Sequence, residues 1–262
     1  MKKVLAITIC FAFIGMGSVL AQTELPKHSV DLGTEISYIK YKEPSVMEEK
    51  GMMYGIVGSY TYRSKFMLRA DGRFSCGQVD YDGALSDGTP YTMDGIDDYM
   101  LELRGLGGYD FPVFTASTLT PYIGIGYRYL NDDSSSSPYG YERESNYIYS
   151  PIGVEIITPL ENDWSLGAML EYDYFWKGTQ KSHLSDIDSG LNDPENKQKK
   201  GYGVRGSVKF QKLDFVIEPF IRYWNIKESE DADITYDGTY VGYGWEPKNT
   251  STEIGCKLAV KF

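Results

Sequence analysis

The chain has 262 residues, and its 37 aspartates and glutamates outnumber its 26 lysines and arginines, which gives a formal net charge of −11. This excess of acidic side chains argues against nucleic acid as a partner, because phosphate backbones are bound by basic surfaces. Beyond the N-terminal segment no run approaches the roughly 18 apolar residues that a membrane-spanning helix needs, so no such helix is predicted.

The N-terminal segment has the parts of a secretory signal peptide. Basic residues at Lys2 and the next position precede the apolar run Val4–Val19, and Ala21 supplies the small residue expected before a cleavage site. We therefore predict a signal peptide over residues 1–21 and a single domain over residues 22–262. An exported chain without a spanning helix is either soluble or a β-barrel.

Ten segments with alternating polar and apolar residues follow along the chain, each long enough to cross a bilayer as a tilted strand. The first five predicted strands are Val30–Tyr41, Met52–Tyr62, Phe66–Val79, Tyr99–Tyr109 and Leu119–Leu130. The last five are Tyr147–Ile157, Trp164–Lys177, Tyr202–Phe210, Phe215–Asn225 and Ser251–Phe262. The alternation is clearest after Trp164, where aromatic and aliphatic residues occupy every second position.

The connections between these segments alternate in length. Four short ones lie near Ser64, Ala116, Glu161 and Lys212, and five longer ones begin at Lys42, Asp82, Asn131, Gly178 and Ile226. Outer-membrane barrels have short periplasmic turns and longer extracellular loops. An even number of strands then places both ends of the barrel domain on the periplasmic side, and the last strand should pair with the first.

Aromatic residues cluster near the ends of the apolar faces, for example Tyr60, Tyr127 and Trp176, as girdles at two membrane interfaces would require. A soluble β-sandwich would not explain why charged residues repeat on the opposite face of nearly every strand. We therefore predict an all-β fold in the cell outer membrane. It is a ten-stranded antiparallel up-and-down transmembrane β-barrel with short periplasmic turns and long extracellular loops.

Three features give the chain a resemblance to a known class of membrane protein. They are the signal segment, the strand Pro121–Tyr129 with its paired glycines, and the closing strand that ends on Phe262. In these features the chain resembles the outer-membrane β-barrels of the OmpA-like and small-porin type in the Gram-negative cell envelope. The resemblance implies outer-membrane lipid and lipopolysaccharide as surroundings. It also implies that Phe262 is part of an assembly signal read by the barrel-assembly machinery.

The charged faces of the predicted strands should line the lumen, with acids and bases in nearly equal number. The predicted lumen charge network consists of Glu35, Arg69, Asp71, Arg73, Glu102, Arg104, Arg128, Glu155, Glu171, Asp173, Arg205, Glu218, Arg222, Glu253 and Lys257. Because a ten-stranded barrel is narrow, paired charges and large inward side chains are expected largely to fill it. A narrow passive channel for a small solute remains the alternative.

The predicted lumen is nearly neutral, so most of the net negative charge should lie in the outer loops, above all in the acidic loop after Ile226. Such loops are either a solvated surface that is free to bind a surface ligand, or they hold divalent cations between lipopolysaccharide phosphates. The sequence suggests no cofactor, no metal site in the barrel and no catalytic residue, and we predict a non-enzymatic protein.

The number of strands keeps an enzymatic alternative open, since omptin proteases are also ten-stranded and carry acidic pairs, one with a histidine, at the outer rim. Asp80 and Asp82 could face His183 across the mouth and help it to activate water. The omptin pattern places an aspartate two residues before its histidine, where this chain has Lys181. The adjacent Ser182 adds a lipid A-modifying enzyme of the Ser–His type to the alternatives.

Overall fold

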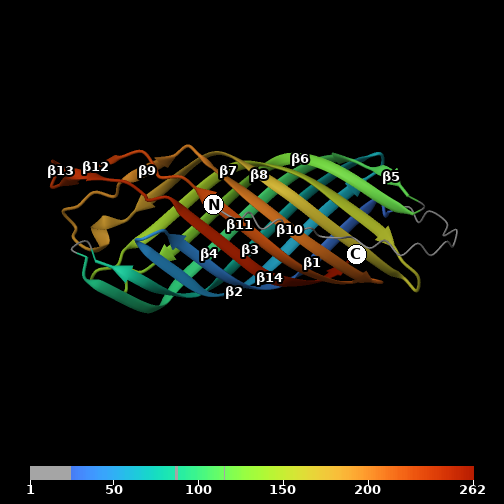
Figure 1. The fold of residues 1–262 in the computed structure, drawn as a ribbon, viewed down its shortest axis with the longest axis horizontal. Helices are drawn as coiled ribbons and strands as arrows, with labels where there is room; N and C mark the ends of the chain where they lie inside the picture. The colour runs from blue at the N-terminus through green and yellow to red at the C-terminus, as the bar shows by residue number, and fades with distance from the viewer. Residues whose placement is uncertain (1–24, 86–87, 115) are drawn as a thin grey trace, which may run out of the picture.

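The computed structural model describes residues 25–85, 88–114 and 116–262, so the predicted signal peptide lies outside the described residues. The described residues form a closed antiparallel barrel of ten strands. Around the barrel the strands follow the order β1-β2-β3-β4-β6-β7-β8-β10-β11-β14, and β14 pairs with β1. Figure 1 shows these strands inclined to the long axis of the molecule. The fold predicted from the alternation is confirmed.

The strands are longer than a bilayer requires. The barrel strands are β1 (His28–Glu43), β2 (Met47–Arg63), β3 (Phe66–Ala84), β4 (Pro90–Tyr109), β6 (Ser117–Asp133), β7 (Glu142–Pro159), β8 (Trp164–Ser182), β10 (Gly201–Lys212), β11 (Phe215–Ile226) and β14 (Asn249–Lys261). The shorter elements are β5 (Phe111–Val113), the 3₁₀ turn η1 (Leu184–Asp186), β9 (Glu195–Gln198), β12 (Ala232–Tyr236) and β13 (Thr239–Gly244). Among the described residues, no helix has the length and hydropathy of a membrane span.

The barrel closes where the last strand meets the first, as predicted. The register between β14 and β1 runs from the pair Asp31 and Lys261 to the pair Lys42 and Thr250. At the end of this seam, the Phe262 backbone N–H donates to the Val30 carbonyl (2.8 Å), and the Val30 N–H donates to the Phe262 carbonyl (3.0 Å). These two bonds tie the C-terminal residue into the ladder, so no sheet edge stays open there.

The outer wall of the barrel is apolar and the lumen is polar, the reverse of a water-soluble protein. Ile56 is 64% exposed and Leu170 is 63% exposed, whereas the lumen residues Glu102 and Arg205 are 2% and 4% exposed. Large apolar side chains on nearly every strand share this outward exposure. This surface is the one that meets lipid, and the alternation along each strand places charged residues on the other side.

Four of the five long connections are more ordered than predicted. The connection after Lys42 is a tight turn between Glu43 and Met47, and much of the region between Asp82 and Asp97 belongs to β3 and β4. The connection after Gly178 continues β8 to Ser182 and then pairs it with β9. The prediction ended each strand where its apolar residues ended. The backbone ladder instead continues above the membrane, because strand pairing satisfies its N–H and C=O groups in water as well.

The two ends of the barrel differ. At one end, called the turn end here, lie the short turns and Phe262, and by the rule for outer-membrane barrels this is the periplasmic end. At the other end, called the hairpin end, the β12–β13 hairpin extends beyond the rest of the barrel, and β9 pairs with the end of β8 (Figure 1). The connection after Ile226 is therefore a structured hairpin, where the prediction had a loop.

Candidate functional site

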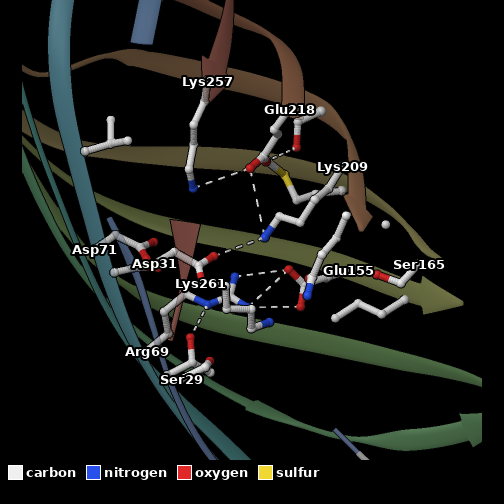
Figure 2. A pocket seen from close by; sticks show the side chains of 18 of the residues that line it. Ser29, Asp31, Arg69, Asp71, Glu155, Ser165, Lys209, Glu218, Lys257 and Lys261 are labelled. Carbon is white, nitrogen blue, oxygen red and sulfur yellow. Dashed lines mark hydrogen bonds and ion pairs between the residues drawn. The ribbon is translucent and has the colours of Figure 1, made fainter. Parts of the chain in front are cut away.

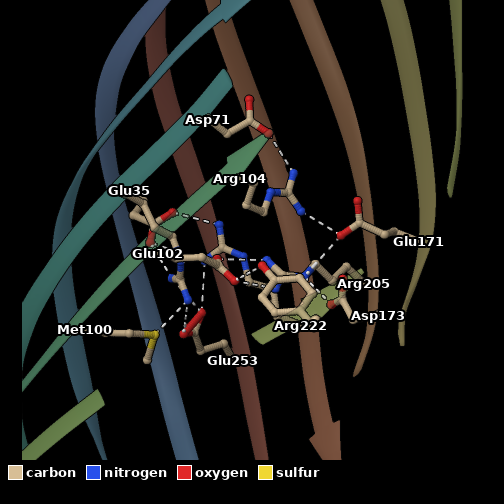
Figure 3. A network of polar contacts seen from close by, with 12 residues as sticks. Glu35, Asp71, Met100, Glu102, Arg104, Glu171, Asp173, Arg205, Arg222 and Glu253 are labelled. Atoms are coloured by element: carbon tan, nitrogen blue, oxygen red, sulfur yellow. Dashed lines mark hydrogen bonds and ion pairs between the residues drawn. The ribbon is translucent and has the colours of Figure 1, made fainter. Parts of the chain in front are cut away.

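The middle of the lumen is crossed by a lattice of buried ion pairs centred on Glu102. Its carboxylate accepts from Arg73 Nε (2.8 Å), from Arg205 Nη1 (2.9 Å) and from the Tyr149 hydroxyl (2.5 Å). Figure 3 shows Glu102 and Arg205 among charged side chains that come from several strands and meet inside the barrel. Each guanidinium has a fixed fork of donors, which suits it to join carboxylates from different strands.

A second part of the lattice joins two guanidiniums to two carboxylates. Arg73 Nη1 lies 2.9 Å from Glu35 Oε1 and 3.0 Å from Glu253 Oε2. Arg222 lies 2.9 Å from each of the same two side chains. The charges balance within this group, so no uncompensated charge is buried here.

In a third part of the lattice, Arg104 joins Asp71 (2.8 Å) to Glu171 (2.6 Å), and Arg205 Nε lies 2.6 Å from Asp173 Oδ2. Figure 3 shows this chain of contacts running from Asp71 to Asp173 beside the Glu102 centre. The result is a layer of alternating charges that spans the lumen from wall to wall.

The remaining predicted residues lie above and below this layer. Glu155 contacts Arg69 (3.0 Å), and Glu218 lies 3.5 Å from the Lys257 ammonium. Within the described residues Arg128 makes no ion pair, and its guanidinium lies over the rings of Tyr147 (5.6 Å) and Trp224 (5.8 Å). The structure therefore places every other member of the predicted charge network in an ion pair.

Apolar side chains close the lumen between this layer and the hairpin end. Two separate clusters of buried side chains lie there. One contains Tyr147, Tyr149, Phe175, Trp224 and Ile226, and the other contains Ile39, Met53, Val79, Ile96, Met100 and Leu130. Tyr149 is fully buried, yet the sequence analysis missed it. Its position an even number of residues before Glu155 on the same strand could have identified it as facing the lumen.

At the turn end the lumen is not filled, which corrects part of the prediction. A cavity of ≈760 Å³ opens there, and its walls carry Asp31, Lys209, Glu218, Lys257 and Lys261 among other charged residues (Figure 2). Small side chains at lumen positions leave the space, namely Ser29, Ser59, Ser165, Gly167 and Ser207. The cavity reaches as far as Arg73 and Glu102, so the ion-pair layer forms its blind end.

The hairpin end of the lumen holds a buried group of acidic side chains that the sequence analysis assigned to loops or left unassigned. The group consists of Glu43, Glu49, Asp98, Asp132 and Glu246, each at most 6% exposed. Arg143 lies among them, 3.2 Å from Glu43 and 3.7 Å from Glu49. One guanidinium cannot balance five ionised carboxylates, so burial here disfavours the ionised form of these side chains.

Burial in this group raises the pKa of Glu246, which lies in the connection between β13 and β14. A carboxyl whose pKa is higher in the folded than in the unfolded state makes the folded state lose stability as the pH rises through these two values. We therefore expect Glu246→Gln to raise the melting temperature of the barrel at pH 8 and to leave it unchanged at pH 4. Loss of heat-modifiable gel migration measures the melting.

The exposed Glu195 on β9 is the matched control, because its replacement by glutamine should change the melting temperature little at either pH. If Glu246→Gln lowers the melting temperature at pH 8, the negative charge of Glu246 stabilises the barrel and the expectation is wrong.

The histidine proposed for catalysis does not meet its proposed partners. Asp80 and Asp82 are exposed and alternate with Val79 and Tyr81, which belong to the lumen cluster, so both aspartates lie on the outer wall of β3. His183 directly follows β8 and contacts Glu144 of β7. Strands β4 and β6 lie between β3 and β7. The expectation that these groups face each other across the mouth is therefore wrong.

The serine beside this histidine points elsewhere too. The Ser182 hydroxyl donates to Glu246 (3.3 Å) in the buried acidic group, whereas His183 Nε2 lies 2.9 Å from Glu144 Oε1. Neighbouring residues on an extended chain project to opposite sides. Ser182 and His183 therefore do not form the Ser–His pair of a deacylase.

Several solved outer-membrane proteins are similar in structure to this chain. The outer membrane protease OmpT from Escherichia coli has a TM-score of 0.57 at 10% identity, over 94% of this chain and 100% of OmpT. The Pseudomonas putida toluene transporter TodX has a TM-score of 0.39 at 10% identity (91% and 90% of the two chains), and the attachment invasion locus protein Ail of Yersinia pestis has 0.36 at 9% identity (90% and 100%). Similarity at this level of identity concerns the fold alone.

No curated protein matches the sequence. The autotransporter beta-domain family, in contrast, matches residues 40–213, which is more than half of the chain. This match spans the strands from β1 to the turn after β10, which together build most of the barrel wall and most of the ion-pair layer. Membership in the OmpA-like or small-porin families stays a prediction. The chain is an outer-membrane β-barrel and belongs to the autotransporter beta-domain family.

Proposed function

We propose that this protein is a non-enzymatic, non-conducting outer-membrane barrel that presents structured hairpins to partners at the cell surface. The observation that carries the proposal is the closed lumen. A layer of ion pairs around Glu102 spans the barrel, and two apolar clusters fill the space between this layer and the hairpin end. The cavity at the turn end stops at this layer.

Opening a path for a solute would require several buried contacts to break together. Arg205 contacts Glu102, Glu171 and Asp173, and all four side chains are at most 5% exposed. Removing one partner from a buried ion pair costs about 3–5 kcal/mol. Breaking the contacts of even one guanidinium is therefore a rare event, and this argues against the narrow passive channel.

The surface-binding part of the proposal rests on the β12–β13 hairpin. Several of its large side chains are exposed, and Tyr240, Val241 and Tyr243 are each more than half exposed. Trp245 directly follows the hairpin and is 53% exposed. Aromatic side chains are enriched in binding interfaces, and exposed apolar groups of this kind mark interaction sites. Outer-membrane barrels have their longer loops on the outside of the cell, so the hairpin end faces the exterior. Its exposed aromatic side chains suit it to bind a partner there.

The absence of enzymatic activity is part of the proposal. It is supported by the outward positions of Asp80 and Asp82 on β3 and by the opposite orientations of Ser182 and His183. Roles for lipopolysaccharide and for the barrel-assembly machinery remain predictions that follow from the resemblance to other outer-membrane barrels.

Planar-bilayer recordings test the closed lumen. We expect the wild-type barrel to show no stable conductance steps at neutral pH. The double variant Tyr149→Ala/Trp224→Ala removes two of the largest side chains of the apolar cluster next to the ion-pair layer. It is expected to produce ion conductance. Heat-modifiable migration on gels checks that the variant is folded. Reproducible single-channel steps from the wild-type protein would contradict the proposal.

A further inference from the structure

Three potential metal ligands meet on the outer wall of the hairpin end. Glu142 and Glu144 alternate along β7 with Arg143, which faces the lumen, so both glutamates point outward. Because Arg143 pairs with Ser182 of β8, the next residue, His183, lies beside Glu142. One ligand atom from each of Glu142, Glu144 and His183 lies within 4.8 Å of the other two.

The imidazole of His183 has a carboxylate at each ring nitrogen. Nε2 lies 2.9 Å from Glu144 Oε1, and Nδ1 lies 3.4 Å from Asp193 Oδ2. A neutral imidazole has only one N–H, so it can donate to one of these carboxylates and presents a lone pair to the other. The second contact is favourable only if a further proton or another cation lies between the ring nitrogen and the carboxylate.

Asp193 is placed to hold the proton on Nδ1. Its Oδ1 accepts from the backbone N–H of Ser185 (3.1 Å), and Lys181 lies 3.9 Å from its Oδ2. Metal-binding histidines commonly donate their other ring N–H to a carboxylate in this way, which fixes the tautomer and the ring orientation. With Nδ1–H directed at Asp193, the lone pair of Nε2 is directed toward Glu144.

The two glutamates are oriented as well. The Asn131 side-chain amide donates to Glu142 Oε1, and no described residue donates a hydrogen bond to Oε2. The Glu142 backbone N–H donates to Asp186 Oδ2 (3.0 Å). Glu144 lies opposite Lys181 on β8 and shares its outward face with Glu142. The hydrogen bonds around the ligands therefore come from β6, from η1 and from the segment before β9.

We propose that Glu142, Glu144 and His183 bind one divalent transition-metal ion of the zinc class on the outer wall of the barrel. Zinc ligands lie about 2.0–2.2 Å from the ion, so donors around one tetrahedral ion are about 3.3 Å apart, close to the separation of His183 Nε2 and Glu144. Two carboxylates and a neutral imidazole exactly compensate a 2+ charge. The imidazole ligand favours zinc over Ca²⁺ and Mg²⁺, which prefer oxygen ligands alone.

The site can be reached from the medium. The side chain of Glu144 is 27% exposed and that of His183 is 17% exposed. Asn146, which follows Glu144 by two residues on β7 and lies nearer the membrane, accepts a hydrogen bond from Tyr127 (2.6 Å), one of the aromatic residues predicted to form the interface girdle. The ligands therefore lie just outside the aromatic girdle, where ions in solution can bind without crossing lipid.

The experiment uses the full barrel in detergent micelles, with Zn²⁺ as the probe. We expect isothermal titration calorimetry to give one Zn²⁺ per chain, and affinity to fall as the pH drops and the imidazole is protonated. Since the chain has only two histidines, labelled-histidine NMR can follow both of them. Zn²⁺ should shift the signals of His183 and leave those of His28, at the turn end, unchanged.

Variants separate this site from non-specific binding. We expect His183→Ala and Glu144→Gln to abolish stoichiometric binding, and Asp193→Asn to weaken it by about 10–100-fold, as loss of a carboxylate behind a ligating histidine does. His28→Ala is the matched control and should bind as the wild type does. Melting curves check that each variant is folded. If one of the two ligand variants is unfolded, Glu142→Gln, which removes the charge of the third ligand, is tested in its place.

Several results would overturn the proposal. Zn²⁺ binding that is unchanged in folded His183→Ala would place the ion elsewhere. Displacement of Zn²⁺ by equimolar Ca²⁺ would indicate a site of oxygen ligands alone. A His183 ring that stays doubly protonated at neutral pH and does not respond to Zn²⁺ would show that a proton, not a metal ion, lies between the two carboxylates.

Discussion

Replacement of Glu102 by glutamine is expected to lower the free energy of unfolding of the barrel by about 3–5 kcal/mol, the usual effect of removing one partner from a buried ion pair. Glu102 is 2% exposed and contacts both Arg73 (2.8 Å) and Arg205 (2.5 Å). Glutamine preserves the shape of the side chain, so the change tests charge and leaves packing intact. Both guanidiniums would then lie next to an amide that can accept only at its oxygen.

Urea-induced unfolding in detergent micelles, followed by tryptophan fluorescence, measures this change. The control is Glu48→Gln, because Glu48 lies at the surface 2.8 Å from Lys40 and its side chain is 23% exposed. Surface ion pairs contribute about 0–1 kcal/mol, so this variant should resemble the wild type. Equal effects from the two substitutions would mean that the ion-pair layer does not stabilise the barrel more than its surface charges do.

Deletion of Phe262 is expected to remove most of the folded barrel from the outer membrane, with a much smaller effect on molecules that have already folded. Its ring is 73% exposed and its backbone makes two hydrogen bonds with Val30. Each such bond contributes about 0.5–1.5 kcal/mol, so the direct loss of stability is moderate. The larger effect follows from the resemblance to outer-membrane barrels, in which the terminal aromatic residue belongs to the assembly signal.

The measurement compares the amount of heat-modifiable protein in outer membranes with urea stability after refolding in micelles. Phe262→Tyr is the matched control, because it keeps the aromatic ring and both backbone bonds, and it should assemble as the wild type does. If the deletion leaves the amount in the membrane unchanged, Phe262 is only an interface anchor.

The alternation of residues was enough to predict the number of barrel strands and their faces, because the period of two is a local property of extended chain. Trp164–Lys177 lies within β8, and the face predicted to be charged does line the lumen at Glu171 and Asp173. The ends of the strands were harder to predict. Above the membrane the outer face meets water, so β3 continues to Ala84 with Asp80 and Asp82 on the face that is apolar within the membrane.

Pairing across the lumen could not be derived in the same way. Arg73 contacts Glu253, which lies 180 positions away in the sequence. Such contacts depend on the tilt of the strands and on the closure of the barrel, and neither is encoded in any one strand. For the same reason the prediction paired Arg128 with the charged network, whereas its guanidinium lies over Tyr147 and Trp224.

The sequence by itself determined that this protein is a ten-stranded outer-membrane barrel with a polar lumen, because alternation and strand length are local properties of each segment. Only the tertiary structure decided where the lumen is closed and where it is open. Small residues from β1, β2, β8 and β10 line the same cavity and leave it open. Likewise, only the pairing of β7 with β8 brings His183 to Glu142 and Glu144, because register sets which residues of two strands become neighbours.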